Sequence, residues 1–118
     1  MPNSPELLAK LDRSKDPDAM VLKQMVAEGA DLSKVHKPDF AFEAAKEVDA
    51  QAIAETLDSL GYEVKIYEPD EENSPYQVIG ERAMVLDLAV LNQLTERFEA
   101  LARANNATYD GWGAEIVE

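Results

Sequence analysis

The apolar positions of residues 1–30 recur at helical spacing. Ser4-Pro5 and Asp16-Pro17 each place a capping side chain before a proline, and proline is well tolerated at the first helical position. Leucine, valine and methionine side chains then follow at intervals of three and four residues. Gly29 is a suitable residue to end the second segment. The pattern predicts an N-terminal helical segment that is either two helices or one interrupted helix.

From residue 35 onward, segments in which apolar and polar residues alternate, as in strands, are separated by segments with helical spacing. Phe40 and Phe42 alternate with polar or small residues, which is the period of a half-buried strand, and Pro38 limits regular pairing where that strand begins. Gly80 indicates a bulge in the third strand. The four predicted strands cover residues 35–44, 62–67, 76–85 and 106–118, and a polar loop at 69–75 joins the second to the third.

Two longer helices are predicted between these strands. Asp49 and Asp87 are the expected N-caps, and Val48 with Ile53 and Leu86 with Leu91 are positioned as hydrophobic staples. Gly61 and the Asn105-Asn106 pair suit the left-handed geometry that ends a helix. The expected buried stripes are Ile53, Leu57 and Leu60 on the first helix, and Leu91, Leu94, Phe98 and Leu101 on the second.

The order strand, helix, strand, strand, helix, strand predicts an α+β fold. Right-handed crossovers turn this order into a ferredoxin-like α/β sandwich, in which a four-stranded antiparallel sheet carries two helices on one face. The last strand then lies at an edge of the sheet, next to the first strand. We expect one domain over residues 1–118, with a helical segment at 1–30 and a ferredoxin-like core at 35–118.

Composition narrows the possible chemistry. The chain has 118 residues and no cysteine, which excludes disulfides, thiol catalysis and cysteine-based zinc sites. It has no apolar run long enough to span a bilayer, and its N-terminal region lacks the apolar core of a signal peptide. A cytoplasmic location without membrane contact is therefore expected.

Charge narrows the possible partners. The net charge is −13, from 24 acidic and 11 basic residues, so the chain as a whole repels RNA and DNA. Such a field favours a basic protein surface as partner. The alternative is that the acidic charge only keeps a small protein soluble.

Catalytic and cofactor signals are weak. His36 is the single histidine, and we interpret it as an ordinary residue at the start of a strand. The glycines form no phosphate-binding loop, and the acids at positions 70–72 lack the spacing of a calcium loop. We expect no enzyme activity, no metal and no cofactor, although a site built from carboxylates alone stays open.

The C-terminal motif is Tyr109-Asp110-Gly111-Trp112-Gly113, which holds the one tryptophan and two of the five glycines. Glycines in a strand indicate a bulge, a bend or a close approach of other atoms. In one interpretation Trp112 packs the sheet against helix residues such as Phe98 and Leu101, and Asp110 pins the turn. In the other, the tyrosine, aspartate and tryptophan form an exposed binding site at the sheet edge. Both interpretations can hold together.

This motif, together with Leu60-Gly61-Tyr62-Glu63-Val64 where a helix ends and a strand opens, resembles the RraB family of ribonuclease E regulators. The resemblance covers roughly residue 35 to the C-terminus. It implies an α/β sandwich that is not an enzyme and that binds ribonuclease E, in particular its basic scaffold region, to dampen or redirect RNA decay. Inhibitors of this type can carry a long acidic tail, whereas this sequence ends at Glu118 and spreads its charge over the domain.

The candidate partner-binding residues are Tyr109, Asp110, Gly111, Trp112, Gly113 and Glu115. An alternative function is a ferredoxin-like module that binds a small ligand or assembles with itself through the sheet as a homo-oligomer.

Overall fold

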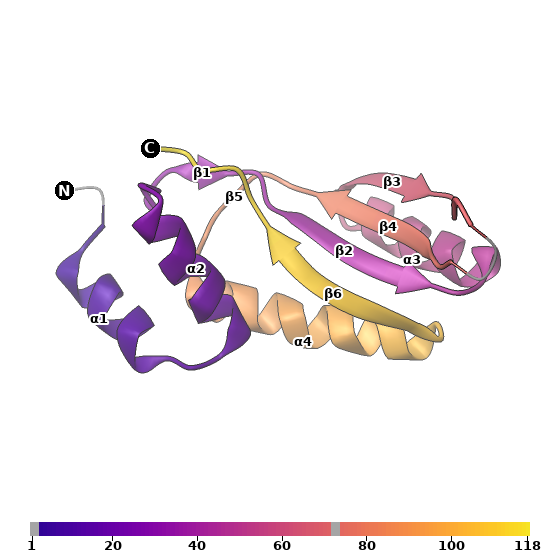
Figure 1. Ribbon diagram of the computed structural model, residues 1–118, viewed down its shortest axis with the longest axis horizontal. Coiled ribbons are helices and arrows are strands. Elements are labelled where there is room, and N and C mark those ends of the chain that lie inside the picture. The colour runs from indigo at the N-terminus through magenta and orange to yellow at the C-terminus, as the bar shows by residue number, and fades with distance from the viewer. Residues whose placement is uncertain (1–2, 72–73) are drawn as a thin grey trace.

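The computed structural model describes residues 3–71 and 74–118. Within these ranges it holds four helices and six strands (Figure 1). The helices are α1 (Pro5–Arg13), α2 (Pro17–Ala27), α3 (Glu47–Ser59) and α4 (Leu88–Ala104). The strands are β1 (Val35–His36), β2 (Asp39–Ala44), β3 (Glu63–Tyr67), β4 (Tyr76–Glu81), β5 (Met84–Val85) and β6 (Ala107–Gly113).

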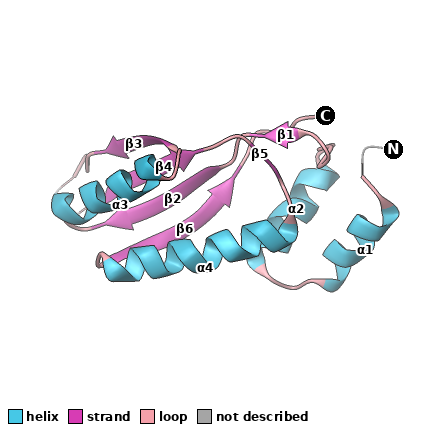
Figure 2. Ribbon diagram, turned by 180° about the vertical axis from the view of Figure 1, so that it is seen from behind, coloured by secondary structure: helices cyan, strands magenta, loops and turns pink. Residues whose placement is uncertain are grey.

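The main sheet has the order β3-β4-β2-β6, and all of its strand pairs are antiparallel. Its last strand, β6, lies at an edge beside its first strand, β2, as the ferredoxin-like order requires. Opposite views of the molecule show α3 and α4 on the same face of this sheet (Figures 1 and 2). The predicted α+β sandwich is therefore confirmed.

The proline signals locate the N-terminal helices correctly. The side chains of Ser4 and Asp16 accept hydrogen bonds from the backbone N–H groups three residues later, and Asp87 does the same for α4. α1 and α2 are two separate helices. Leu11 and Leu22 bury one face of each against the core.

The prediction for the start of α3 was wrong. The helix begins at Glu47 after an extended Lys46, and no side chain caps it. Asp49 lies inside the first turn, where a negative charge still interacts favourably with the helix dipole. Val48 is 68% exposed, so it forms no hydrophobic staple with Ile53.

Two predicted strands are each divided in the structure. Residues 35–44 split on either side of Pro38, which has no N–H to donate, into β1 and β2. Residues 76–85 split likewise into β4 and β5. The small strands β1 and β5 pair with each other and form a second, two-stranded sheet.

The last strand is shorter than predicted, because it ends at Gly113. Residues 114–118 leave the sheet and follow the loop before β1. There the Asp31 N–H donates to the Val117 carbonyl at 2.8 Å, and the Val117 N–H donates to Nε2 of His36 at 3.2 Å. The chain end is thus held by β1 rather than by the sheet.

The core lies between the main sheet and the two helices. Phe40 and Phe42 of β2 are fully buried, and their rings meet the Phe98 ring of α4 edge-on at 5.1 and 5.4 Å between centroids. The predicted stripe on α4 is confirmed, since Leu91 and Phe98 are buried and Leu94 and Leu101 pack against the core.

Two details of this core differ from the prediction. Leu60 is 52% exposed, because it follows the last helical turn of α3 instead of facing the sheet. Gly80 forms no bulge and pairs in register with Phe40 and Val64. A Cβ at this position would lie 3.1 Å from the Leu57 Cδ1 atom, so the glycine allows α3 to lie close to β4.

Candidate functional site

The C-terminal motif contains a β-bulge in β6. Ala41 of β2 pairs with Gly111 and Phe42 pairs with Tyr109, which leaves Asp110 as an extra residue. Gly111 has a φ of +95°, a conformation that side chains with a Cβ rarely adopt. In an unbroken strand, positions 109 and 112 would point to opposite faces. The extra residue places both aromatic side chains on the helix-covered face.

Tyr109 belongs to the aromatic core. Its ring centroid lies 5.1 Å from that of Phe42 and 5.6 Å from that of Phe98. Its hydroxyl is buried and makes no hydrogen bond among the described residues. Burial raises the pKa of this hydroxyl, and the nearby negative charge of Asp18 raises it further.

Trp112 connects three elements through a buried carboxylate. Its Nε1–H donates a hydrogen bond of 2.9 Å to Asp18 at the start of α2, and Asp18 is only 5% exposed. The Thr95 hydroxyl of α4 lies 2.9 Å from both oxygens of the same carboxylate. The Asn92 amide, with its nitrogen turned toward the carboxylates, donates to Asp18 at 2.8 Å. The tryptophan thus fastens β6 to α2 and α4.

Asp110 lies on the other face of the sheet. It is exposed and stands beside Glu43 of β2. The negative charge of Asp110 raises the pKa of the Glu43 carboxyl, with burial as a second cause. The bulge therefore divides the motif, because it turns the aromatic side chains inward and the carboxylate outward.

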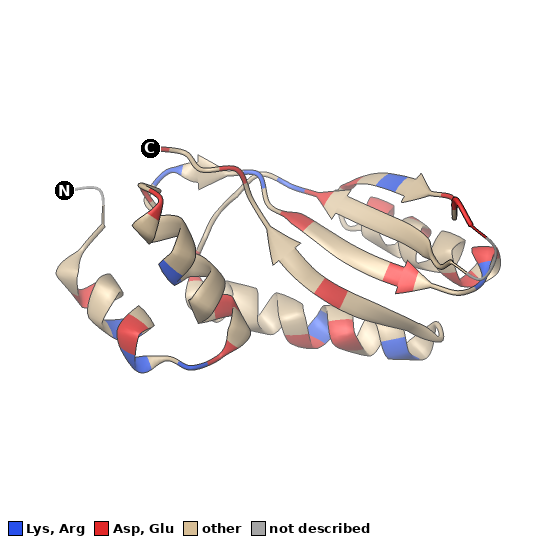
Figure 3. Cartoon of the chain, in the orientation of Figure 1, with Lys and Arg blue, Asp and Glu red and all other residues tan. Residues whose placement is uncertain are grey.

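The outward face of the main sheet carries the polar positions of the alternating strands. We call it the acidic sheet face, and α3 and α4 both lie behind it in Figure 1. Strand register and alternation place five carboxylates on it: Asp39, Glu43, Glu63, Glu81 and Asp110. Figure 3 marks acidic positions along β2, β4 and β6.

Lysines partly offset this negative charge at one end. The Lys37 ammonium lies 3.1 Å from Glu63 and 3.6 Å from Glu81, and the hydrogen bond to Glu63 is the main reason that its pKa is raised. Lys65 of β3 shares the face by its register with Ile79. At the other end, the Glu43–Asp110 pair has no cation within ion-pair distance among the described residues. The negative field is therefore strongest around that pair.

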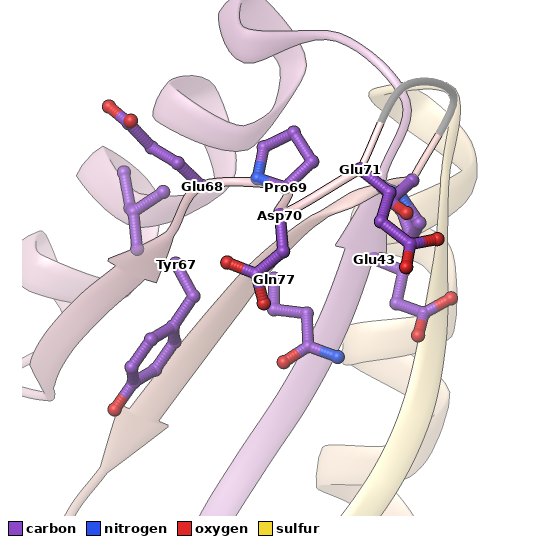
Figure 4. Close-up of a pocket in the computed structure, with 10 residues that line it drawn as sticks. Glu43, Tyr67, Glu68, Pro69, Asp70, Glu71 and Gln77 are labelled. Atoms are coloured by element: carbon purple, nitrogen blue, oxygen red, sulfur yellow. The ribbon is translucent and has the colours of Figure 1, made fainter.

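A hollow of about 680 Å³ borders the Glu43 end of the acidic sheet face. It lies between the β3–β4 loop and the strand ends. Figure 4 shows Asp70, Gln77 and Glu43 directed toward the same space, with Glu68 pointing away from it. Of the predicted loop acids at 70–72, position 72 lies outside the described residues.

A second hollow, of about 460 Å³, lies at the Lys37 end of the same face. Lys37, Asp39, Gly113 and Glu115 are among the residues that line it. Gly113 pairs with Asp39 of β2, and a Cβ on it would make an ordinary contact, at 3.8 Å, with an Asp39 carboxylate oxygen.

The six predicted site residues therefore do not meet in one pocket. Tyr109 and Trp112 face the helices, Asp110 lies on the acidic sheet face, and Glu115 lines the hollow at its far end. Sequence reasoning missed four acids of this face, which are Asp39, Glu43, Glu63 and Glu81. The available signal was that each occupies a polar position in an alternating strand.

His36 has a structural role, as its interpretation as an ordinary strand residue implied. The side chain is 1% exposed; Nδ1 lies 3.0 Å from the Lys34 carbonyl, and Nε2 accepts from the Val117 N–H. Both ring nitrogens are thus used by the backbone. In the part of the chain that the structure describes, no group of three or more acidic or histidine side chains is arranged to hold a metal ion. In the same part, no helix has the length and apolar character to cross a membrane.

Comparison with protein families adds a decisive observation. Residues 15–114 match the family described as "Regulator of ribonuclease activity B". The chain belongs to the RraB family. Its RraB match starts at residue 15 rather than near Val35, so α2 is part of the family's unit and α1 precedes it. This extent agrees with the hydrogen bond that joins Asp18 of α2 to Trp112 of the C-terminal motif. Comparison with curated proteins finds no significant match.

Membership assigns the protein to a family of ribonuclease regulators. The C-terminal motif in β6 holds the fold together on one side and contributes a carboxylate to the acidic sheet face on the other.

Proposed function

We propose that this protein is a non-enzymatic regulator that binds ribonuclease E through a cationic segment and so modulates RNA decay. By family resemblance, the segment is the basic scaffold region of that enzyme. The proposal places the protein in the cytoplasm and gives it no direct contact with RNA. The observation that carries it is the acidic sheet face, which has five carboxylates and two lysines and which none of the helices in the described residues covers.

The charge of this face suits a cationic peptide. One lysine is already shared between two of the five carboxylates, which leaves Asp39, Glu43 and Asp110 available to a partner. A cationic segment gains from their summed field, whereas a phosphate backbone is repelled by it. Because these groups are exposed, added salt should weaken the attraction strongly.

The Glu43–Asp110 pair is the best candidate for the centre of the contact. Two neighbouring carboxylates repel each other, as the raised pKa of Glu43 reflects. A guanidinium between them would replace this repulsion with two charge-assisted hydrogen bonds. Arginine is therefore the partner side chain that this pair favours.

In this proposal the six motif residues have different roles. Asp110 and Glu115 contact the partner. Tyr109, Gly111 and Trp112 act through the shape of β6, because they anchor the strand and form the bulge that presents Asp110. Gly113 pairs with Asp39 and lines the hollow beside it.

A second candidate function is self-association through the sheet. It is favoured by exposed apolar side chains on the edge strand β3, where Ile66 is 39% exposed and Tyr67 is 50% exposed. Sedimentation velocity over a range of protein concentrations tests this candidate. A monomer at every concentration would remove it.

The main proposal is tested by fluorescence anisotropy with a labelled arginine-rich peptide from the ribonuclease E scaffold region. We expect binding that weakens steeply as salt is raised, and no binding of single-stranded RNA at the same salt. Asp110→Lys should weaken peptide binding about tenfold, which corresponds to about 1.4 kcal/mol. The matched control is Asp58→Lys, an exposed charge reversal on α3, behind the sheet.

Three results would contradict the proposal. They are no affinity for the peptide at low salt, tight binding of the RNA, and equal losses from the two charge reversals. Equal losses would show that net charge alone, rather than the acidic sheet face, attracts the peptide.

A further inference from the structure

A small apolar pocket opens on the helix side of the molecule. It has a volume of about 270 Å³ and lies between α3 and α4. Leucine side chains from the end of α3 and from α4 form its walls, and the rings of Tyr62 and Phe98 contribute to its lining. Leu60 is 52% exposed beside it, although leucine is among the residues most often buried.

Two arginines stand at this pocket. Arg82, which follows β4, holds its guanidinium carbon 5.6 Å from the centre of the Tyr62 ring. Arg97 of α4 also lines the pocket. Neither guanidinium lies within 4.0 Å of a carboxylate anywhere in residues 3–71 and 74–118.

Both arginines are exposed and border the leucine and aromatic side chains of the pocket, in a chain with 24 acidic and 11 basic residues. An arginine pair beside an apolar surface complements a ligand that carries an apolar group between negative charges.

The size of the pocket separates two kinds of ligand. Small-molecule sites usually enclose about 300–1,000 Å³ and bury most of the ligand. A smaller, partly open pocket instead suits one large side chain inserted from a protein surface, which is the usual geometry of an interface anchor.

We propose that the pocket between α3 and α4 is a docking site for a partner polypeptide, which inserts one large hydrophobic side chain and places flanking carboxylates against Arg82 and Arg97. This inference goes beyond the proposed function, because the site lies across the sheet from the acidic sheet face and prefers the opposite charge. An acidic peptide is repelled by the acidic sheet face, and a cationic peptide is repelled by the arginines. The two faces therefore hold two different segments at once.

The test uses the full chain and a fluorescent peptide with one tryptophan between pairs of glutamates. Two matched peptides replace the tryptophan with alanine or the glutamates with lysines. We expect NMR shifts in the methyl groups of Leu60, Leu94 and Leu101 with the first peptide only, because the lysine peptide is attracted to the acidic sheet face instead.

Protein variants locate the contact. Arg97→Gln and Arg82→Gln should each weaken binding about tenfold, since each removes charge-assisted hydrogen bonds. Arg103→Gln is the matched control, because it makes the same change on the same helix outside the pocket, and it should alter affinity less than twofold. All three arginines are exposed, so each variant should fold, which circular dichroism checks.

Other outcomes overturn the proposal. An equal loss with Arg103→Gln would mean unspecific charge attraction, and the absence of shifts at the leucine methyls would place the peptide elsewhere. Tighter binding of octanoate than of the peptide at these methyls would assign the pocket to a small amphipathic molecule. The arginine-rich peptide of the proposed function should bind Arg97→Gln as well as it binds the wild type, so the two proposals fail independently.

Discussion

The two faces of the main sheet are built from alternating residues of the same four strands, yet they differ in almost every physical respect. On the helix-covered face, Phe40, Phe42 and Val78 are fully buried. On the acidic sheet face, the alternate positions of the strands include five carboxylates and Lys65, interspersed with Ala41, Gln77 and Ile79. The comparison shows that the alternation of side chains along each strand separates two roles. One set of positions builds the core, and the other set is free to contact a partner.

The energetic difference between the faces is large. Burial of an aromatic side chain contributes about 1.5–3 kcal/mol, whereas an exposed ion pair contributes about 0–1 kcal/mol. The acidic sheet face therefore adds little to stability, and its charges are not explained by folding. β6 is the strand where the two faces meet most closely, because its bulge sends neighbouring residues to opposite sides.

The largest effect on the helix-covered face is expected at Trp112. Trp112→Ala should lower the free energy of unfolding by about 3–5 kcal/mol, because it removes core packing and takes one of its hydrogen-bond donors from the buried Asp18 carboxylate. Trp112→Phe keeps an aromatic ring and loses the N–H, so it should cost about 1.5–3 kcal/mol. Urea unfolding measures both values.

The same two variants decide between the interpretations of this tryptophan. If both unfold like the wild type and only binding to the ribonuclease peptide is lost, then Trp112 is a contact residue and not a structural anchor.

An intermediate effect is expected at Gly111, the residue that separates the two faces. Gly111→Ala should cost about 1–2 kcal/mol, because its φ of +95° is unfavourable for a residue with a Cβ, although no atom lies within 4 Å of the added methyl. Gly113→Ala is the control, since its added Cβ meets only an ordinary contact at 3.8 Å, and it should cost less. Thermal unfolding compares them, and equal losses would show that the φ angle is not the cause.

The smallest effect is expected on the acidic sheet face. The pKa of Glu43 in the folded protein is raised above its ordinary value of 4.5, so the folded state holds this proton more tightly than the unfolded state does. The corresponding stability is present below pH 4.5 and is lost as the pH rises through the raised pKa. Glu43→Gln removes the repulsion between the ionised Glu43 and Asp110 carboxylates in the folded state. It should therefore stabilise the protein by a few tenths of a kcal/mol at neutral pH.

Urea unfolding at about pH 4 and about pH 7 measures this dependence. Glu55→Gln, on the exposed side of α3, controls for the removal of one negative charge. If the two variants show the same change with pH, then Asp110 is not the cause of the raised pKa.

Local signals in the sequence predicted local structure well. Ser4, Asp16 and Asp87 cap their helices, and Gly61 and Asn106 have the positive φ values that the ends of helices require. The prediction failed where packing overrides a local signal. Asp49 is a good capping residue, yet α3 starts two positions earlier at Glu47.

The two glycine predictions had different outcomes for the same reason, since one depends on local conformation and the other on packing between elements. The kink predicted in the C-terminal motif exists, because Gly111 adopts a conformation that a local pattern can indicate. Gly80 was predicted as a bulge, but its role is to give room to Leu57 of α3. The sequence neighbours of a glycine do not indicate that another element packs closely against it.

The candidate site was predictable only in part. The motif and the acidic charge were visible, and the family match confirms the resemblance that they carried. The partner-binding role of the six motif residues stays a prediction, and the structure adds that the bulge divides them between two faces.

The sequence by itself determined the order of the elements, the alternation that separates core from surface, and the family, because each depends on residues close together in the chain. Only the tertiary structure decided that Trp112 binds Asp18, a residue 94 positions away, and that Asp110 stands beside Glu43. These contacts depend on strand register and on how α2 packs against α4, which are set by the whole core rather than by a local pattern. The residues of the acidic sheet face are therefore dispersed along the sequence, and only the fold brings them together.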